Sequence, residues 1–136
     1  MIRAERLTKC FGDFTAIRDV SFEAAEGEVV GFLGVNGAGK TTTLRVLTGF
    51  HPPTSGRAVV AGFDVSSDSI SARRNIGYMP ETTPLYNEMR VVEYLRFRSA
   101  IKGVERGRRA QETDRVIERA GLREVSRQII GTLSKG

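Results

Sequence analysis

Residues 34–42, GVNGAGKTT, combine residue types and a spacing that are suited to binding phosphate. They fit the pattern G-x-x-x-x-G-K-[ST], with Gly34, Gly39, Lys40 and Thr41 at its fixed positions. Glycine permits backbone conformations that bring peptide N–H groups close to phosphate oxygens, and a helix that starts here points its positive end at the same charge. We therefore predict a P-loop at residues 34–42 that binds the phosphates of a nucleotide.

The side chains of the P-loop have separate predicted roles. Lys40 would neutralise the β- and γ-phosphates, the Thr41 hydroxyl would ligate Mg²⁺, and Thr42 would add a hydrogen bond to phosphate. The residues expected to contact the nucleotide are Gly34, Asn36, Gly37, Ala38, Gly39, Lys40, Thr41 and Thr42. The alternative is a glycine-rich turn that binds nothing. The flanking sequence disfavours it, because the motif requires a preceding strand and a following helix and both are predicted.

The strand and the helix that must position the P-loop follow from the residues on either side of it. Residues 29–33, VVGFL, are continuously apolar, which is typical of a strand buried on both faces of a mostly parallel sheet. Residues 41–47 contain no helix breaker and place Leu44 and Leu47 at helical spacing, with Gly49 positioned to end the helix. The order strand, glycine loop, helix is therefore expected.

The remainder of residues 1–85 is predicted to complete an α/β core. Apolar residues alternate at period two in residues 2–7 and 16–24, which predicts two half-buried strands of an antiparallel layer, joined by a turn within residues 9–14. Short strands are also expected at residues 58–61 and 76–79, with a loop and a short helix in residues 64–75.

Residues 86–136 are predicted to form a helical subdomain attached to this core. Apolar residues follow helical spacing in residues 89–101 and 110–120, and Gly103 and Gly121 are expected to bound these helices. The fold class is therefore α/β, with an N-terminal antiparallel layer, a P-loop core and a helical part. Because the sequence stops without a closing helix or polar tail, we also expect the fold to be incomplete at its C-terminus.

Composition excludes several classes of function. The 136 residues, 40% hydrophobic and 27% charged, are typical of one soluble globular domain, and no apolar stretch approaches the roughly 18 residues that cross a membrane. Cys10 is the only cysteine and His51 the only histidine, which excludes an internal disulfide and a zinc cluster. The net charge of +5 comes largely from arginines after residue 105 that are interleaved with acids, so a salt-bridged helix face is favoured over a nucleic-acid surface.

Residues 7–50, from LTKCFGDF to RVLTGF, resemble the start of the nucleotide-binding domain of ABC transporters, and the resemblance continues along the whole chain. It implies a P-loop NTPase fold and ATP with Mg²⁺ as ligands. The implied partners are a second ATP-binding domain and a transmembrane permease subunit, with no direct nucleic-acid contact. Phe11 matches the position of an aromatic residue that stacks on adenine in that family, and stacking needs no hydroxyl. Packing of Phe11 within the antiparallel layer is the alternative.

Two further segments resemble motifs of the same family. IGYMPETTPLYNEMRVVEYL, residues 76–95, resembles the Q-loop, with Glu81 in place of the usual glutamine. A carboxylate can still ligate Mg²⁺, directly or through water. Within it, GYxPE followed by PLY resembles the branch that serves ABC-2-type exporters. The final LSKG resembles the opening of the LSGGQ signature, so Ser134 and Gly136 are implied to contact ATP held by an opposite subunit, with Lys135 in place of a glycine.

The residues that this family uses for hydrolysis are absent from residues 1–136. They are an Asp-Glu pair after an apolar strand, for Mg²⁺ and the attacking water, and a later histidine. Residues 58–64, AVVAGFD, imitate such a strand, but Val65 follows Asp64 where glutamate is needed, and His51 lies too early, in a proline turn at the surface. We predict no catalytic residue in these 136 residues, and binding of Mg-ATP without its hydrolysis.

The resemblance favours an ABC-type ATPase subunit that, in a full-length dimer, couples hydrolysis to transport, on the cytoplasmic face of the cell membrane. A soluble ABC-type ATPase acting on ribosomes or DNA is the alternative. DNA-acting members carry a long coiled coil between P-loop and signature, and no long heptad run is present here. Members that act on ribosomes carry two such cassettes in one chain, and only sequence downstream of these residues would distinguish them from transporter subunits. A kinase or GTPase would explain neither the segment around Glu81 nor the LSKG end.

Overall fold

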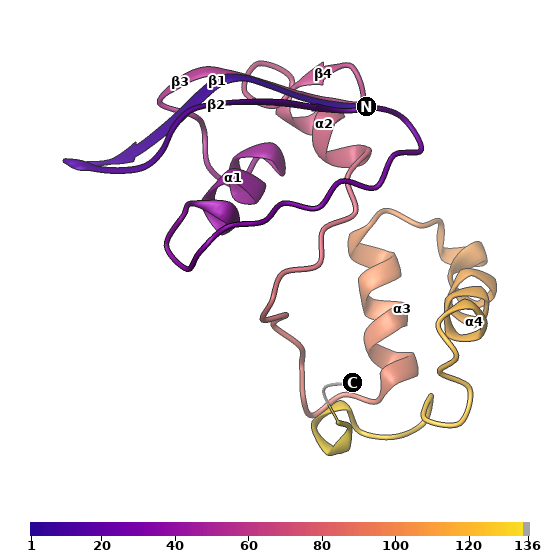
Figure 1. The fold of residues 1–136 in the computed structure, drawn as a ribbon. Coiled ribbons are helices and arrows are strands. Elements are labelled where there is room, and N and C mark those ends of the chain that lie inside the picture. Colours follow the sequence, from indigo (N-terminus) through magenta and orange to yellow (C-terminus); the bar gives the residue numbers. More distant parts are fainter. Residues whose placement is uncertain (135–136) are drawn as a thin grey trace. The chain divides into compact units, whose positions relative to one another are not determined.

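The computed structural model describes residues 1–134, which form two compact units (Figure 1). The first unit runs from Met1 to Met79, and the second begins at Pro80. The boundary expected from the sequence lies after residue 85. In the structure residues 80–85 belong to the helical unit instead. Each unit is packed around its own buried residues.

The first unit is built on a four-stranded antiparallel sheet in the order β2-β1-β3-β4. Its strands are β1 (Ile2–Phe11), β2 (Phe14–Ala24), β3 (Ser55–Val60) and β4 (Phe63–Asp64). β1 and β2 form a long hairpin in which Phe11 pairs with Phe14 around a turn at Gly12 and Asp13. The predicted antiparallel layer is confirmed, and its turn is shorter than expected because strand pairing continues through Phe11.

The register of this hairpin shifts at three places, and two of them lie beside residues with a left-handed backbone. Arg6 and Asp19 have positive φ angles of 45° and 50°, and the register of β1 on β2 shifts beside them. The N–H groups that lose their strand partner at these positions donate to hydroxyl groups instead. Arg6 N–H donates to Ser21 Oγ at 2.8 Å, and Asp19 N–H donates to Thr8 Oγ1 at 3.0 Å. Bulges increase the local twist of a strand pair, and the hairpin accordingly curves toward its tip (Figure 1).

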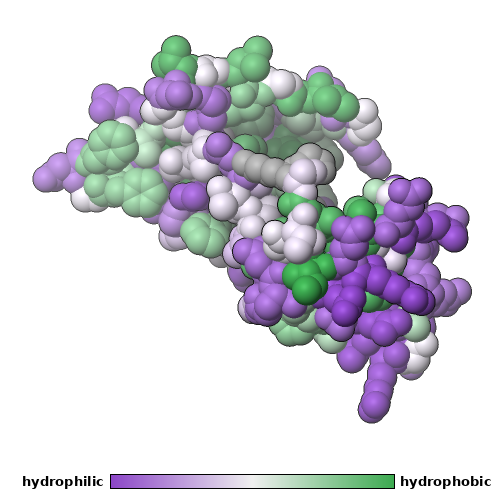
Figure 2. Space-filling view, turned by 90° about the horizontal axis from the view of Figure 1, so that it is seen from below, coloured by the Kyte–Doolittle hydropathy of each residue, from purple (hydrophilic) through white to green (hydrophobic). Residues whose placement is uncertain are grey.

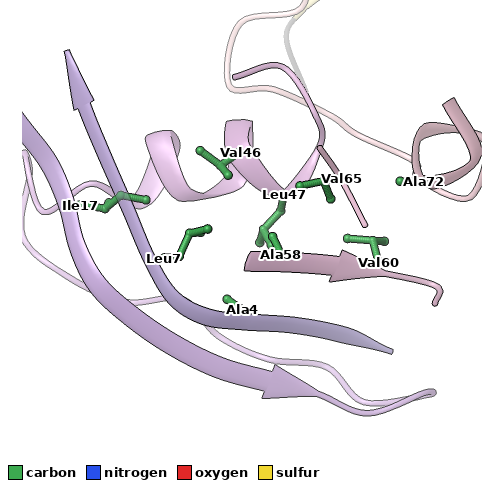
Figure 3. Close-up of a cluster of buried hydrophobic side chains, with 9 residues drawn as sticks. All are labelled: Ala4, Leu7, Ile17, Val46, Leu47, Ala58, Val60, Val65 and Ala72. Carbon is green, nitrogen blue, oxygen red and sulfur yellow. The ribbon is translucent and has the colours of Figure 1, made fainter. Parts of the chain in front are cut away.

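Both helices of the first unit, α1 (Lys40–Leu47) and α2 (Ser69–Arg74), lie on the same side of the sheet (Figure 1). α1 directs Val46 and Leu47 toward β1 and β3, where Leu7 is fully buried (Figure 3). Burial of one such side chain contributes about 1.5–3 kcal/mol. The core consists of Ala4, Leu7, Ile17, Val46, Leu47, Ala58, Val60, Val65 and Ala72. It holds the C-terminal half of α1 and thereby positions the P-loop at the other end of that helix.

The apolar segment before the P-loop is not a strand. The prediction of a strand at residues 29–33 is wrong for this structure, and so is the prediction for residues 76–79. Val29 is 97% exposed and Leu33 is 93% exposed. A strand forms only where neighbouring strands take up its N–H and C=O groups. Among residues 1–134 neither segment pairs with another strand, and the sheet ends at β2 on one side and β4 on the other. The Phe32 ring still packs on Phe22 of β2, with centroids 5.4 Å apart.

The second unit consists mainly of α3 (Val91–Ile101) and α4 (Arg109–Arg119), with the 3₁₀ turns η1 (Arg106–Arg108) and η2 (Ile130–Thr132). The two predicted helices are confirmed, and Gly103 and Gly121 follow them with φ angles of 78° and 67°. Val91 and Ile117 are buried between them, together with Thr113. The segment after α4 returns to the start of α3, where Ile130 N–H donates to the Met89 carbonyl at 2.9 Å.

Arginines and acids of the second unit form the expected ion pairs on its surface. Glu112 lies 3.6 Å from Arg108 and 2.7 Å from Arg115, and Glu118 lies 2.9 Å from Arg123. The face of this unit seen in Figure 2 is largely hydrophilic. The ion pairs predicted for this arginine-rich segment are present at Arg108, Arg115 and Arg123. Within residues 1–134 no helix has the length and apolar character needed to cross a membrane.

Candidate phosphate-binding site

The P-loop ends in a left-handed glycine from which α1 starts. Gly37 and Gly39 both have φ of 85°, and Gly39 is the N-cap of the helix that begins at Lys40. The helix start has no side-chain cap, so the first N–H groups of α1 are left for a ligand. Such groups, at the positive end of a helix, are suited to anions. The P-loop thus has the left-handed glycines and the following helix that the motif predicts, although no strand precedes it among residues 1–134.

The Lys40 side chain folds back across the P-loop. Its ammonium donates to the carbonyl oxygens of Gly34 at 2.6 Å and Val35 at 2.7 Å. A lysine ammonium has three donors and a full positive charge. This ammonium lies against a loop whose backbone N–H groups are also donors. This concentration of donors and positive charge fits a polyphosphate such as the β- and γ-phosphates of ATP.

The three threonines after Lys40 differ in their surroundings. Thr41 is exposed and Thr42 is half-buried, whereas Thr43 is buried with its hydroxyl donating to the Gly39 carbonyl at 3.0 Å. Thr43 therefore secures the first turn of α1 internally. The Thr41 hydroxyl makes no hydrogen bond to protein among residues 1–134, which leaves its oxygen as a ligand of the hard type that Mg²⁺ prefers.

Gly39 also seats the P-loop against β2. A Cβ atom at this position would lie 2.4 Å from the Ala16 carbonyl oxygen and 2.4 Å from Ile17 Cγ2. Gly37 has the same φ, but a Cβ there would meet nothing within 4 Å. Gly39 is thus required both for its backbone conformation and for the close approach of β2, whereas Gly37 is required for its conformation alone.

Phe11 lies at the end of β1 in the same unit as the P-loop, and 43% of its surface is exposed. It is not part of the buried core, so the alternative of a core-packing role is disfavoured. Its ring makes an edge contact with His51, at 5.3 Å between centroids and 79° between planes. The Lys9 ammonium lies 5.0 Å from the Phe11 centroid. The Phe11 side chain is therefore exposed at the surface, with its ring in contact with His51 and Lys9.

His51 is a residue of this region to which the sequence analysis assigned no role in binding. It was expected to be a surface residue in a proline turn, but the structure shows it half-buried between two aromatic rings, with Phe50 on its other side at 4.9 Å. The Phe11 and His51 rings come from segments far apart in the chain. No pattern of local spacing signals such a contact.

The remaining predicted nucleotide contacts lie outside the first unit. Glu81 and Ser134 belong to the second unit, where both are exposed in irregular segments. Gly136 and the neighbouring Lys135 lie outside the described residues. Residues 34–42 and Phe11 thus belong to one unit, and Glu81 and Ser134 belong to the other.

Asp64, which imitates a metal-binding aspartate in the sequence, has a structural role. Arg57 Nε donates to its Oδ2 at 2.9 Å, and the N–H groups of Ser66 and Ser67 donate to its Oδ1 at 2.9 and 3.1 Å. The Arg57 guanidinium, aided by these N–H groups, holds the pKa of Asp64 at about 2, below its ordinary 3.8. Both carboxylate oxygens are therefore engaged in closing the turn after β4.

We expect Asp64→Asn to lower the free energy of unfolding at pH 7 by about 1 kcal/mol, because the ion pair with Arg57 is lost. The loss is small because Arg57 is exposed and water already screens its charge. Because the folded pKa of about 2 lies below the unfolded value of 3.8, this stability is present above about pH 4 and is lost as pH falls toward 2. Urea unfolding at pH 7, 4 and 3 measures it. Asp68→Asn, at an exposed acid in the same loop, is the control. A difference from wild type that grows as the pH falls would contradict the assignment.

Comparison with known families gives one consistent result. A family model described as ABC transporter matches residues 17–136. A probable multidrug ABC transporter ATP-binding protein, YbhF of Escherichia coli, is 39% identical over 136 residues, covering 100% of this chain and 24% of that protein. The linearmycin resistance ATP-binding protein LnrL of Bacillus subtilis is 34% identical, covering 100% of this chain and 44% of that protein. The chain thus spans less than half the length of these curated relatives.

Solved structures agree with this result at the level of the fold. A structure titled as an ATP-binding subunit of an ABC transporter has a TM-score of 0.81 and 26% identity, covering 98% of this chain and 56% of that one. The dimeric ABC cassette MJ0796 has a TM-score of 0.82 at 22% identity, covering 99% of this chain and 64% of that one. The predicted α/β P-loop fold class is confirmed, although the apolar segment 29–33 is unpaired here.

Proposed function

Because the chain belongs to the ABC transporter family, whose model matches residues 17–136, we propose that it binds Mg-ATP as part of the ATP-binding subunit of such a transporter. The observation that carries the proposal is the Lys40 ammonium held 2.6 and 2.7 Å from two carbonyls of the P-loop, above the uncapped start of α1. These groups supply positive charge and N–H donors at one place. A triphosphate is the ligand that uses them together.

In the proposed complex Lys40 exchanges its two carbonyl acceptors for oxygens of the β- and γ-phosphates. The exchange is favourable because a phosphate carries a full negative charge and a carbonyl does not. The N–H groups of Gly37, Gly39 and the first turn of α1 donate to the same phosphates. The Thr41 hydroxyl takes one position around Mg²⁺, which neutralises phosphate charge when it is bound. Phe11 provides an aromatic face for the adenine base.

The second unit is proposed to contribute to a composite site in a dimer. Ser134 and Gly136 would contact ATP held by the opposite subunit, as the resemblance of LSKG to the family's signature implies. Glu81 would stand near Mg²⁺ in the position of the usual glutamine. A transmembrane permease subunit is the second proposed partner, which places the subunit on the cytoplasmic face of the membrane. The dimeric titles of two structural neighbours support a two-domain arrangement.

We favour export of the ABC-2 type over the soluble alternative. The relatives are named for multidrug transport, linearmycin resistance and phospholipid transport. A DNA-acting ABC ATPase would carry a long coiled coil before the signature, whereas α3 and α4 have 11 residues each. The GYxPE and PLY sequences favour the same branch.

The proposal predicts that residues 1–136 bind Mg-ATP and do not turn it over. The sequence contains no adjacent Asp-Glu pair that would hold Mg²⁺ and orient the attacking water. Calorimetric titration with Mg-ATP measures binding, and release of inorganic phosphate measures turnover. Binding without phosphate release is the expected result. Phosphate release that disappears in Lys40→Ala would contradict the prediction, since the activity would then belong to this site.

A further inference from the structure

We propose that His51 is a positioning residue for the nucleotide base. It would hold the ring of Phe11 in the orientation that receives adenine and connect that ring to the helix that carries Lys40. The proposal rests on the proposed function, because it takes Phe11 as the base platform. It adds a residue whose contact with Phe11 is evident only in three dimensions.

The His51 ring lies between two aromatic side chains. Its centroid is 5.3 Å from that of Phe11, with 79° between the planes, and 4.9 Å from that of Phe50, with 77° between the planes. Both are edge-to-face geometries, the arrangement in which aromatic rings attract each other most specifically. His51 is half-buried, while Phe11 and Phe50 are 43% and 69% exposed. The imidazole is therefore the inner member of the group and limits the rotation of the outer rings.

The backbone around His51 is fixed at the end of α1. The N–H groups of Phe50 and His51 both donate to the Arg45 carbonyl, at 2.8 and 3.2 Å. Gly49, with φ of 68°, makes the turn that allows this. Because Arg45 belongs to the helix whose first residue is Lys40, a short rigid path connects His51 to the P-loop.

The other side of the same segment is fixed to β1. Thr54 N–H donates to the Thr8 carbonyl at 2.8 Å, and Cys10 N–H donates to Thr54 Oγ1 at 2.9 Å. Pro52 and Pro53 join His51 to Thr54 with restricted φ angles. Residues 50–54 therefore tie the strand that carries Phe11 to the helix that carries Lys40. The base and the phosphates of one nucleotide are a fixed distance apart, so a rigid connection between Phe11 and Lys40 would favour binding of both groups.

An exposed phenylalanine without such support would lose rotamer freedom when a base stacks on it, and this loss would weaken binding. The His51 contact removes part of that freedom before the nucleotide arrives. The effect is confined to ligands that carry a base. A ligand made only of phosphates contacts the P-loop and does not use the Phe11 ring.

The test compares Mg-ATP with Mg-tripolyphosphate by calorimetry on the full chain. We expect His51→Leu to weaken ATP binding by about 3- to 10-fold, the range of one edge-to-face aromatic pair, and to leave tripolyphosphate binding unchanged. His51→Phe should restore ATP binding because it keeps the ring contact. Phe11→Leu should weaken ATP binding at least as much, and His51→Leu should add nothing to it. Phe63→Leu, in β4, is the matched control and should bind both ligands as wild type does.

The outcomes separate this inference from the proposed function. If Phe11→Leu weakens ATP binding and His51→Leu does not, the positioning role is overturned and the base platform stands. If neither variant affects ATP binding, the platform fails and the positioning role fails with it. An equal loss for both ligands in His51→Leu would also overturn the proposal, since it would indicate damage to the P-loop. Should His51→Leu fail to unfold cooperatively, His51→Gln replaces it in the same comparison.

Discussion

Lys40→Ala is expected to abolish tight binding of Mg-ATP while leaving the fold intact. Among residues 1–134 the ammonium interacts with two loop carbonyls alone, which stay exposed to water when it is removed. In the complex it makes charge-assisted bonds to phosphate, each worth about 1.5–3 kcal/mol. Loss of two such bonds lowers the affinity by about 100-fold or more. Calorimetric titration with Mg-ATP measures this loss.

The control is a lysine removed elsewhere on the chain. Lys102→Ala, at the C-cap of α3 in the second unit, changes the net charge by the same amount. It should bind Mg-ATP as wild type does, which separates a local contact from a general change of charge. If Lys40→Ala keeps wild-type affinity, or if both variants lose it equally, the P-loop is not the phosphate site.

Gly39→Ala is expected to be the most destabilising single methyl addition in the P-loop. Its Cβ would lie 2.4 Å from both the Ala16 carbonyl oxygen and Ile17 Cγ2, so that β2 and the P-loop must separate. The left-handed backbone costs about 1 kcal/mol with any side chain, and overpacking of this kind adds about 1–3 kcal/mol. We expect a loss of about 3 kcal/mol in the free energy of unfolding, measured in urea.

Gly37→Ala is the matched control for this prediction. It has the same φ of 85°, but its Cβ meets nothing within 4 Å, so it carries the backbone strain without the clash. The expected loss is about 1 kcal/mol. Equal stability losses in the two variants would show that the contact between the P-loop and β2 does not contribute to the fold.

Local sequence features predicted the parts of this structure that local forces determine. The glycines and lysine of the P-loop, the unbroken run that becomes α1, and Gly49 after it each act within a few residues. The alternation in residues 2–7 and 16–24 likewise predicted the β1–β2 hairpin, because adjacent strands joined by a short turn pair with each other. α3 and α4 follow from helical spacing and the glycines that end them.

The strand expected at residues 29–33 does not form, and the reason cannot be read from the local sequence. Its apolar character indicates a place in the interior of a sheet, where a strand has a partner on each side. Among residues 1–134 these residues lie outside the sheet, and Val29 and Leu33 are almost fully exposed. The pattern predicted the environment that the segment requires, and the described part of the chain does not provide it.

The contact between Phe11 and His51 was beyond sequence reasoning for a different reason. Phe11 was identified through a family resemblance, and His51 was judged by its neighbours Pro52 and Pro53. What joins the two rings is the pairing of β1 with β3 and the return of the chain from α1. These are long-range features, and they decide which side chains surround a ligand even where each element is predicted correctly.

The central claim is that the P-loop holds the phosphates of ATP, and a titration of the backbone amide NMR signals with Mg-ATP tests it most directly. The largest shifts should occur at Gly37, Gly39, Lys40 and Thr41, and they should be absent from Lys40→Ala at the same nucleotide concentration. Shifts centred instead on the apolar cavity between α3 and α4, lined by residues such as Leu95 and Val116, would contradict the claim. So would P-loop shifts that persist unchanged in the variant.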